Sequence, residues 1–387
     1  MADMQLATAS RIQKWDSDFF LEYVRDTRYR PFMGRSTRNA MMPIVAKYEL
    51  ASGGKTVNIP LITRLKGGGV QGTTRLVGNE EALGNFNKPI TVNWNRNGVS
   101  IPKPEESWTE IDLREAARMQ LRTWAAEVLR DDITCAMMAY DGTSFLGGKS
   151  ADDTATAPRT PLQAYLAVSE ATKNAWLAAN ADRFLFGNAV SNNASNNHAN
   201  SLLNVDTTND KLTSAVVSLA KIRAQQADPR LRPFKTDDGM GREWFVMFVS
   251  SLGMNQLKQD TPMVNANRDA RAREGNGMDN NPIFQSGDLI WDGVIIREVP
   301  EIPVITGVGN SGSDVAPAFL CGAQAVGVAW GQEPATRIKK EDDYGFVYGV
   351  AIEECRAASK LTFASGTGGA TVQHGMLTVW HSAPALA

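Results

Sequence analysis

Apolar residues recur at helical spacing along the stretch 107–140, and this pattern predicts one long helix. Leu121 and Val128 belong to an apolar face that continues through the stretch. Two capping patterns, in which a hydroxyl residue precedes an acidic residue by three positions, begin at Ser107 and Thr109 and mark its start. A helix of this length spans roughly 50 Å. We therefore expect it to form a spine on which other elements pack.

Before the spine, the segment 51–106 has the pattern of a two-stranded ribbon. The stretches 55–65 and 88–101 both show the partial alternation of strands. The glycine-rich sequence between them predicts a pliable tip. An isolated ribbon is marginal in water, so we expect it to lie on a neighbouring surface. The alternative is a hairpin that folds back onto its own domain.

The region after the spine alternates between helical and strand patterns. Helices are predicted at 160–180 and 211–226, and the continuous apolar run 244–250 is typical of a buried central strand. The low-complexity stretch 191–201 is expected to be a surface loop. The tail, 345–380, reads as successive strands.

The first 50 residues have no closed core of their own and are expected to form an arm. Their apolar residues occur in short clusters such as Trp15, Phe19 and Phe20, and a second cluster lies at 29–33. Eight Lys or Arg residues and four acidic residues between positions 11 and 47 make the arm locally basic. Its aromatics must pack against another part of the chain or another chain. A solvated helix with a few basic residues is the alternative.

Composition excludes several classes of function. The formal net charge of −2 argues against a dedicated nucleic-acid binder, which is normally basic. No run of about 18 apolar residues occurs, so no membrane-spanning helix is predicted. Cys135, Cys321 and Cys355 lie far apart and in no metal-ligand spacing, which predicts buried thiols in a reducing compartment. We expect a protein made and assembled in cytoplasm.

No sequence motif nominates a catalytic, cofactor or metal site. Gly307, Gly309 and Gly312 spell the dinucleotide pattern, but strand-like residues follow where a helix is needed. The phosphate-loop-like sequence at 148–150 lacks its leading glycine, and the three histidines have no partner at zinc-ligand spacing. The prediction is a protein without catalytic residues, cofactor or metal, although an active site assembled from distant positions leaves an enzyme possible.

The order of the segments resembles a known family. An arm, a Gly-tipped ribbon, a long spine helix, a mixed α/β block and a strand-rich tail is similar to the order in tailed-bacteriophage major capsid proteins. Local phrases carry the resemblance over nearly the whole length. They are GNEEAL in the ribbon, IDLREAA in the spine, CGAQAVGVAWGQ, EDDYGFVYGVAIEECRAASKLTF and HGMLTV.

The resemblance implies an α+β tailed-phage capsid fold with a spine helix and an extended ribbon loop. Its implied segments are an N-terminal arm (1–50), an extended loop (51–106), a peripheral domain (107–145 and 335–387) and an axial domain (146–334). The implied function is self-assembly into pentamers and hexamers of an icosahedral virion shell enclosing double-stranded DNA. Such a shell is assembled in the host bacterial cytoplasm and does not contact a membrane.

The resemblance also implies partners. They are other copies of the chain, packaged DNA in weak non-specific contact, a portal, and a separate scaffolding or decoration protein. No long charged helical segment precedes the arm, so a separate scaffolding protein or none is expected. Two alternatives remain at this point: a cellular cargo compartment with the same fold, and a cytoplasmic α/β enzyme with an inserted ribbon.

Candidate contacts between subunits follow from charge spacing. Arg114, Arg118 and Arg122 fall four residues apart and form a basic stripe on the spine, where like charges repel slightly. The ribbon carries the acidic pair Glu80 and Glu81 at its tip. The prediction is that the stripe receives these acids from a neighbouring subunit. The alternative is a solvated helix face.

Overall fold

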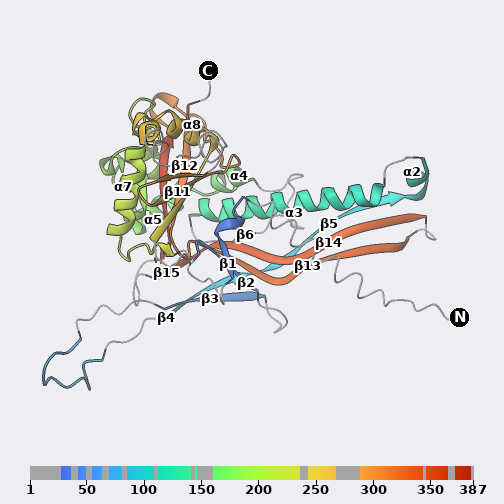
Figure 1. Ribbon diagram of the computed structural model, residues 1–387, viewed down its shortest axis with the longest axis horizontal. Helices are drawn as coiled ribbons and strands as arrows, with labels where there is room; N and C mark the ends of the chain where they lie inside the picture. Colours follow the sequence, from blue (N-terminus) through green and yellow to red (C-terminus); the bar gives the residue numbers. More distant parts are fainter. Residues whose placement is uncertain are drawn as a thin grey trace, which may run out of the picture.

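The computed structural model describes residues 28–35, 42–48, 55–62, 69–80, 85–108, 112–140, 144–145, 160–235, 243–266, 288–342, 346–364 and 371–384. Figure 1 shows two units. In the long unit, helix α3 runs beside an elongated sheet. In the compact unit, at the end of that helix, helices surround a second sheet.

The sheet of the long unit has the strand order β1-β2-β13-β14-β5, and the short strand β6 also pairs with β14. β14 is antiparallel to β13 and to β5, whereas β2 is parallel to β13. The strands are Met33–Arg35 (β1), Ile44–Tyr48 (β2), Asn93–Pro102 (β5), Ser144–Phe145 (β6), Val326–Asp342 (β13) and Val347–Lys360 (β14).

The spine helix α3 spans Leu113–Met138, which is shorter than the predicted 107–140. Its N-cap is Asp112, whose carboxylate accepts hydrogen bonds of 3.0 and 3.2 Å from two backbone N–H groups of the first turn. This carboxylate satisfies two of the four donors that a helix start leaves open. Lys103–Trp108 form a separate short helix, α2. The 26-residue spine is about 39 Å long.

The compact sheet has the order β10-β11-β9-β12-β17-β7, with β8 also paired to β9. The predicted buried central strand is confirmed, because β9 lies between β11 and β12 and its residues 245–249 are buried. The strands are Phe184–Phe186 (β7), Phe234–Lys235 (β8), Glu243–Val249 (β9), Leu289–Trp291 (β10), Val294–Glu298 (β11), Val315–Cys321 (β12) and Met376–Ser382 (β17).

Helices surround the compact sheet (Figure 1). The predicted helix 160–180 is two helices, because Ser169 accepts a hydrogen bond from the N–H of Thr172 and starts a new one. The α-helices are Pro161–Leu166 (α4), Glu170–Ala179 (α5), His198–Leu203 (α6), Ser214–Gln226 (α7) and Ser251–Gln259 (α8). The 3₁₀ turns are Arg30–Phe32 (η1), Ala181–Arg183 (η2), Val190–Asn192 (η3) and Asn310–Gly312 (η5).

The low-complexity stretch 191–201 lies mostly at the surface, as predicted from its composition, but its residues 198–201 belong to helix α6 instead of a loop. Asn197 caps helix α6 by accepting a hydrogen bond of 3.0 Å from the N–H of Asn200. Ser201 is buried, and its hydroxyl donates to the carbonyl of Asn197 at 2.6 Å. The Asn and Ser side chains satisfy backbone groups locally, which gives a polar stretch a defined fold.

The ribbon consists of the antiparallel strands Thr56–Ile62 (β3) and Asn85–Thr91 (β4). Val57, Ile59 and Ile90 form an apolar cluster with small residues of β13 and β14. The base of the ribbon thus packs on the long sheet of its own subunit, as in the alternative considered for this segment. A small hairpin, Thr362–Ala364 (β15) with Thr371–Gln373 (β16), lies near it.

The segment boundaries predicted from the sequence differ from the strand pairing. Strand β17 was expected with the peripheral segment 335–387, but it lies inside the compact sheet. Strand β5 was expected in the ribbon segment 51–106, but it forms an edge of the long sheet. The physical reason is that a strand joins the sheet with which it forms hydrogen bonds, and its partner strands can be remote in the sequence.

Candidate assembly surfaces

The basic stripe on the spine lies against the subunit's own sheet at its far end. The guanidinium of Arg114 stands 4.8 Å from the centre of the Tyr348 ring of β14, a cation–π contact. Arg118 pairs with Glu115 at 3.1 Å, and its side chain is only 17% exposed. Arg122 is half-buried. The stripe is therefore partly covered within the subunit rather than being a fully solvated face.

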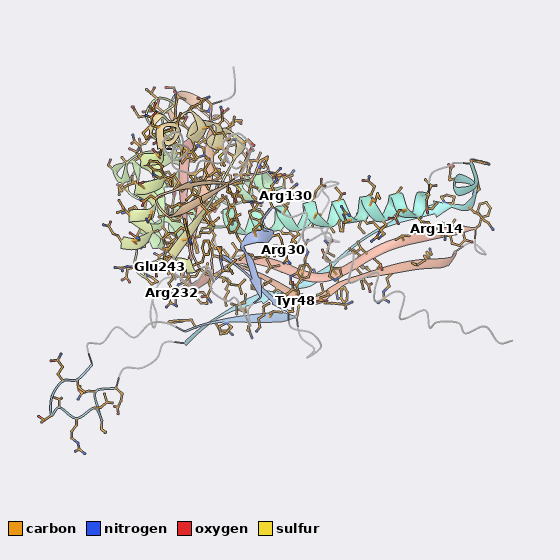
Figure 2. All side chains as sticks on the ribbon, viewed as in Figure 1. Arg30, Tyr48, Arg114, Arg130, Arg232 and Glu243 are labelled. Atoms are coloured by element: carbon orange, nitrogen blue, oxygen red, sulfur yellow. The ribbon has the colours of Figure 1, made fainter. Side chains whose placement is uncertain are left out.

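Within one subunit, the acids predicted to meet the stripe of a neighbouring subunit lie far from their own stripe. Glu80 belongs to the ribbon tip 69–80, which is drawn at the opposite end of the subunit from Arg114 (Figure 2). Its carboxylate accepts a hydrogen bond of 2.7 Å from the backbone N–H of Gly78. Glu81 lies outside the described residues, as do the arm residues Trp15, Phe19 and Phe20.

The second aromatic cluster of the arm packs inside the subunit. Tyr29 is fully buried, its ring meets Phe248 edge-on at 4.9 Å, and its hydroxyl lies 2.9 Å from the hydroxyl of Thr134. Nearby, Arg130 of the spine pairs with Glu301 at 3.1 Å. Figure 2 labels Arg130 at the compact-unit end of the spine. The end of the arm thus joins the spine to the compact unit.

A buried set of charges fixes the spine to the long sheet. Arg356 of β14 is fully buried and donates to Asp132 of the spine at 2.5 Å and to Glu354 at 2.7 Å. Asn95 of β5 donates to the same glutamate at 3.3 Å. Sequence reasoning missed this set. The available signal was charged residues at alternate positions of an otherwise apolar strand.

His198 marks the joint between the spine and the compact unit. Its Nε2 lies 2.7 Å from the hydroxyl of Tyr140, just beyond the spine's end, and its Nδ1 lies 3.7 Å from the Glu170 carboxylate. The rings of Tyr165, Phe186 and Trp380 enclose it. Burial lowers the pKa of His198 to about 4. The imidazole is neutral at pH 7 and acts as a packing and hydrogen-bonding group.

The rejected dinucleotide pattern has the wrong structure for that chemistry. Gly307, Gly309 and Gly312 lead into strand β12, so the helix N-terminus that binds a pyrophosphate is absent from this position. In the described ranges, His, Cys, Asp and Glu residues form no group of three or more that fits a metal ion. No described helix has the length and apolar character needed to cross a membrane.

Comparison with known proteins identifies the family. A family model described as phage capsid protein matches residues 4–385. The major capsid protein of Pseudomonas phage KPP25 is 25% identical over 380 residues, which cover 95% of this chain and 94% of that protein. The cyanophage Pam1 capsid asymmetric unit contains a chain with 35% identity and a TM-score of 0.74, with 100% of both chains covered.

A further solved structure agrees in fold. The capsid of Ralstonia phage GP4 has a TM-score of 0.67 at 22% identity, and the match covers 92% of this chain and 90% of that chain. The predicted fold class, a tailed-phage capsid fold of mixed helix and sheet, is confirmed. The phage matches also favour a viral shell over the two alternatives, a cargo compartment and an enzyme. The chain therefore belongs to the phage capsid protein family, and it is a structural subunit that self-associates into the shell of a phage.

Proposed function

We propose that this subunit forms the pentamers and hexamers of an icosahedral shell that encloses double-stranded DNA. The observation that carries the proposal is the ribbon. Its base packs on the subunit's own sheet, while its tip, residues 69–80, extends well away from both units (Figure 1). A chain that builds such a projection needs another surface to cover it, and a shell provides that surface on the adjacent copy.

In this proposal the long unit is the peripheral domain and the compact unit is the axial domain near the capsomer centre. The ribbon is the extended loop that reaches across an adjacent subunit, and residues 1–27 lace neighbours together. The structure supports one refinement. Residues 29–33 and strand β2 are part of the subunit's own core and sheet, so only the preceding residues are assigned to the lacing arm.

The proposed contact with DNA is weak and non-specific. The formal net charge of −2 suits a wall that faces DNA without holding it, since a strongly basic wall would bind the genome tightly. We further propose that the subunit has no catalytic role, that it is assembled in the host bacterial cytoplasm, and that a portal and a separate scaffolding or decoration protein are its other partners.

The test is deletion of residues 66–87, which removes the tip together with Asn85–Asn87, the first three residues of strand β4, and leaves strand β3 whole. We expect a soluble, folded protein that forms capsomers poorly or not at all, as seen by electron microscopy and sedimentation. Normal shells from this variant would contradict the extended-loop assignment. Nuclease-protected double-stranded DNA in particles recovered from infected cells would support a virus shell, whereas a packaged enzyme would support a cargo compartment.

A further inference from the structure

The ribbon tip contains a hydrogen-bonded turn at residues 76–79. The backbone N–H of Asn79 donates to the carbonyl of Leu76 at 2.9 Å, which closes a four-residue β-turn. Gly78, the third residue of the turn, has φ +91°, a conformation that favours glycine. The side chain of Asn79 also donates to the carbonyl of Arg75 at 3.0 Å. Three local features therefore fix the conformation of residues 75–79.

Glu80 follows this turn directly and hydrogen-bonds back to it. Its carboxylate accepts the 2.7 Å hydrogen bond from the N–H of Gly78, a donor that would otherwise face solvent. The Glu80 carboxylate therefore stabilises the turn within its own subunit. This hydrogen bond requires an acceptor oxygen but not a negative charge. This observation separates two roles for Glu80: fixing the turn, and pairing with an arginine on another subunit.

The apex of the turn is apolar. Leu76 is 58% exposed and Val77 is 78% exposed, and both stand among polar neighbours. The position where a Cβ would stand on Gly78 has no atom within 4 Å, so no described residue covers this side of the turn. Holding two large apolar side chains at the point of a projection favours burial against another surface.

We propose that the turn Leu76–Val77–Gly78–Asn79 is a preformed apolar contact that packs against a second copy of this chain. The proposal rests on the assignment of the ribbon as the extended loop. The partner is a second copy because the family assembles into shells and because the tip projects away from its own subunit (Figure 1). A preformed turn lowers the ordering cost of each contact, which suits a small interface repeated throughout a shell.

The proposal differs from an ion pair between the tip and the arginine stripe in two measurable ways. An apolar contact is little affected by salt, whereas exposed ion pairs weaken as salt rises. A neutral residue that retains an acceptor oxygen preserves the turn, whereas it abolishes the ion pair. Glu80→Gln meets this requirement, because the glutamine carbonyl can accept from the N–H of Gly78.

The experiment measures the critical subunit concentration for shell assembly at low and high salt. We expect Leu76→Ser with Val77→Ser to raise it by about tenfold or more. Gly78→Val, which strains the turn, and Glu80→Ala, which removes its acceptor, should also raise it. Glu80→Gln should assemble like the parent at both salts. The matched control is Leu166→Ser, since Leu166 is 61% exposed but lies on helix α4 of the compact unit.

Thermal unfolding of the unassembled variants should be unchanged, because the tip is remote from the core. Normal assembly of the double serine variant would overturn the proposal, and so would a Glu80→Gln defect that equals that of Glu80→Ala. Deletion of 66–87 distinguishes a failure of the apolar-turn proposal from a failure of the extended-loop assignment. If the deletion blocks assembly while the double serine variant assembles normally, the extended loop stands and the apolar turn fails. If the deletion also assembles normally, the extended-loop assignment fails as well.

Discussion

Arg356 shows how single residues hold the spine in place. It is fully buried with carboxylates of Asp132 and Glu354, at 2.5 and 2.7 Å. Removing one member of a buried ion set leaves the others desolvated and uncompensated, which costs about 3–5 kcal/mol. We therefore expect Arg356→Met to lower the free energy of unfolding by this amount, measured by chemical denaturation of the unassembled subunit.

The matched control lies on the same sheet. Arg337 pairs with Glu353 at 2.6 Å, but its side chain is 67% exposed, and an ion pair of this kind contributes about 0–1 kcal/mol. Arg337→Met should therefore change the unfolding free energy little. Equal losses for the two arginine variants would contradict the role assigned to burial.

The histidines predict how stability depends on pH. Burial lowers the pKa of His198, His374 and His381 each to about 4, below the usual 6.5. Between these values the unfolded chain binds protons that the folded chain does not, so stability is full above about pH 6.5 and falls towards pH 4. Each histidine contributes a slope that approaches about 1.4 kcal/mol per pH unit.

This slope is measurable between pH 5 and 6, where few carboxylates titrate. His374→Gln removes one of the three groups, so the slope of unfolding free energy against pH should fall by about a third. The slope, rather than the absolute stability, is compared because the substitution itself changes packing. An unchanged slope would mean that His374 titrates normally in the folded protein.

At the scale of elements, the packing of the ribbon on the long sheet requires a small residue at position 327, where a larger side chain would meet the ribbon. A Cβ on Gly327 of β13 would stand 2.6 Å from the Cδ1 of Ile59 and 3.0 Å from that of Ile90. Alanine meets only the ends of flexible side chains, which can shift. Valine fills the space that both isoleucines occupy and overpacks the cluster, at a cost of about 1–3 kcal/mol.

We therefore predict a graded series at this position. Gly327→Ala should leave ribbon packing and assembly nearly unchanged, whereas Gly327→Val should lower stability and increase hydrogen exchange in β3 and β4. Hydrogen exchange read out by mass spectrometry measures both strands directly. Increased exchange in the compact unit instead would place the effect elsewhere.

Sequence patterns located most elements because their signals are local. The apolar period revealed the spine, and the apolar run 244–250 revealed β9. Their ends were harder to place. Asp112 rather than Ser107 begins the spine, and Ser169 divides a predicted helix into two. Several residues in each region are able to cap, and only the path of the surrounding chain selects one.

At the scale of the whole molecule, the two units share one core. A single apolar cluster includes Ile133 of the spine, Ile352 of the long sheet, and Phe248 and Phe319 of the compact sheet. The chain also returns from β14 to the compact sheet through β17. We therefore expect the unassembled subunit to unfold in one cooperative transition rather than in two.

The native thiols report on this transition. Cys135 lies on the spine, Cys321 on β12 and Cys355 on β14, and all three are buried. Burial also raises the pKa of Cys321 to about 12, which suppresses its reactive thiolate. In rising denaturant the three should become accessible to a thiol reagent at the same midpoint. Separate midpoints for Cys321 and Cys355 would show that the units unfold independently.

The thiols are not expected to hold the shell together. Among the described residues none of them forms a disulfide. Replacing all three with alanine should lower stability by about 1–3 kcal/mol in total, because small buried groups are lost, and should leave assembly intact. A non-reducing gel that shows a covalent network on which the shells depend would contradict this expectation.

The sequence by itself determined the family and the approximate positions of the spine, the ribbon and the central strand. These signals are local periods and short phrases in a set order, so they are readable without knowing any distant contact. Tertiary structure alone decided which sheet each strand joined, and it placed Arg356 on Asp132, 224 positions away. It also decided that the acid at the tip braces a turn with an apolar apex. These outcomes depend on contacts between residues far apart in the chain. Local sequence patterns describe only neighbouring residues, so they do not specify such contacts.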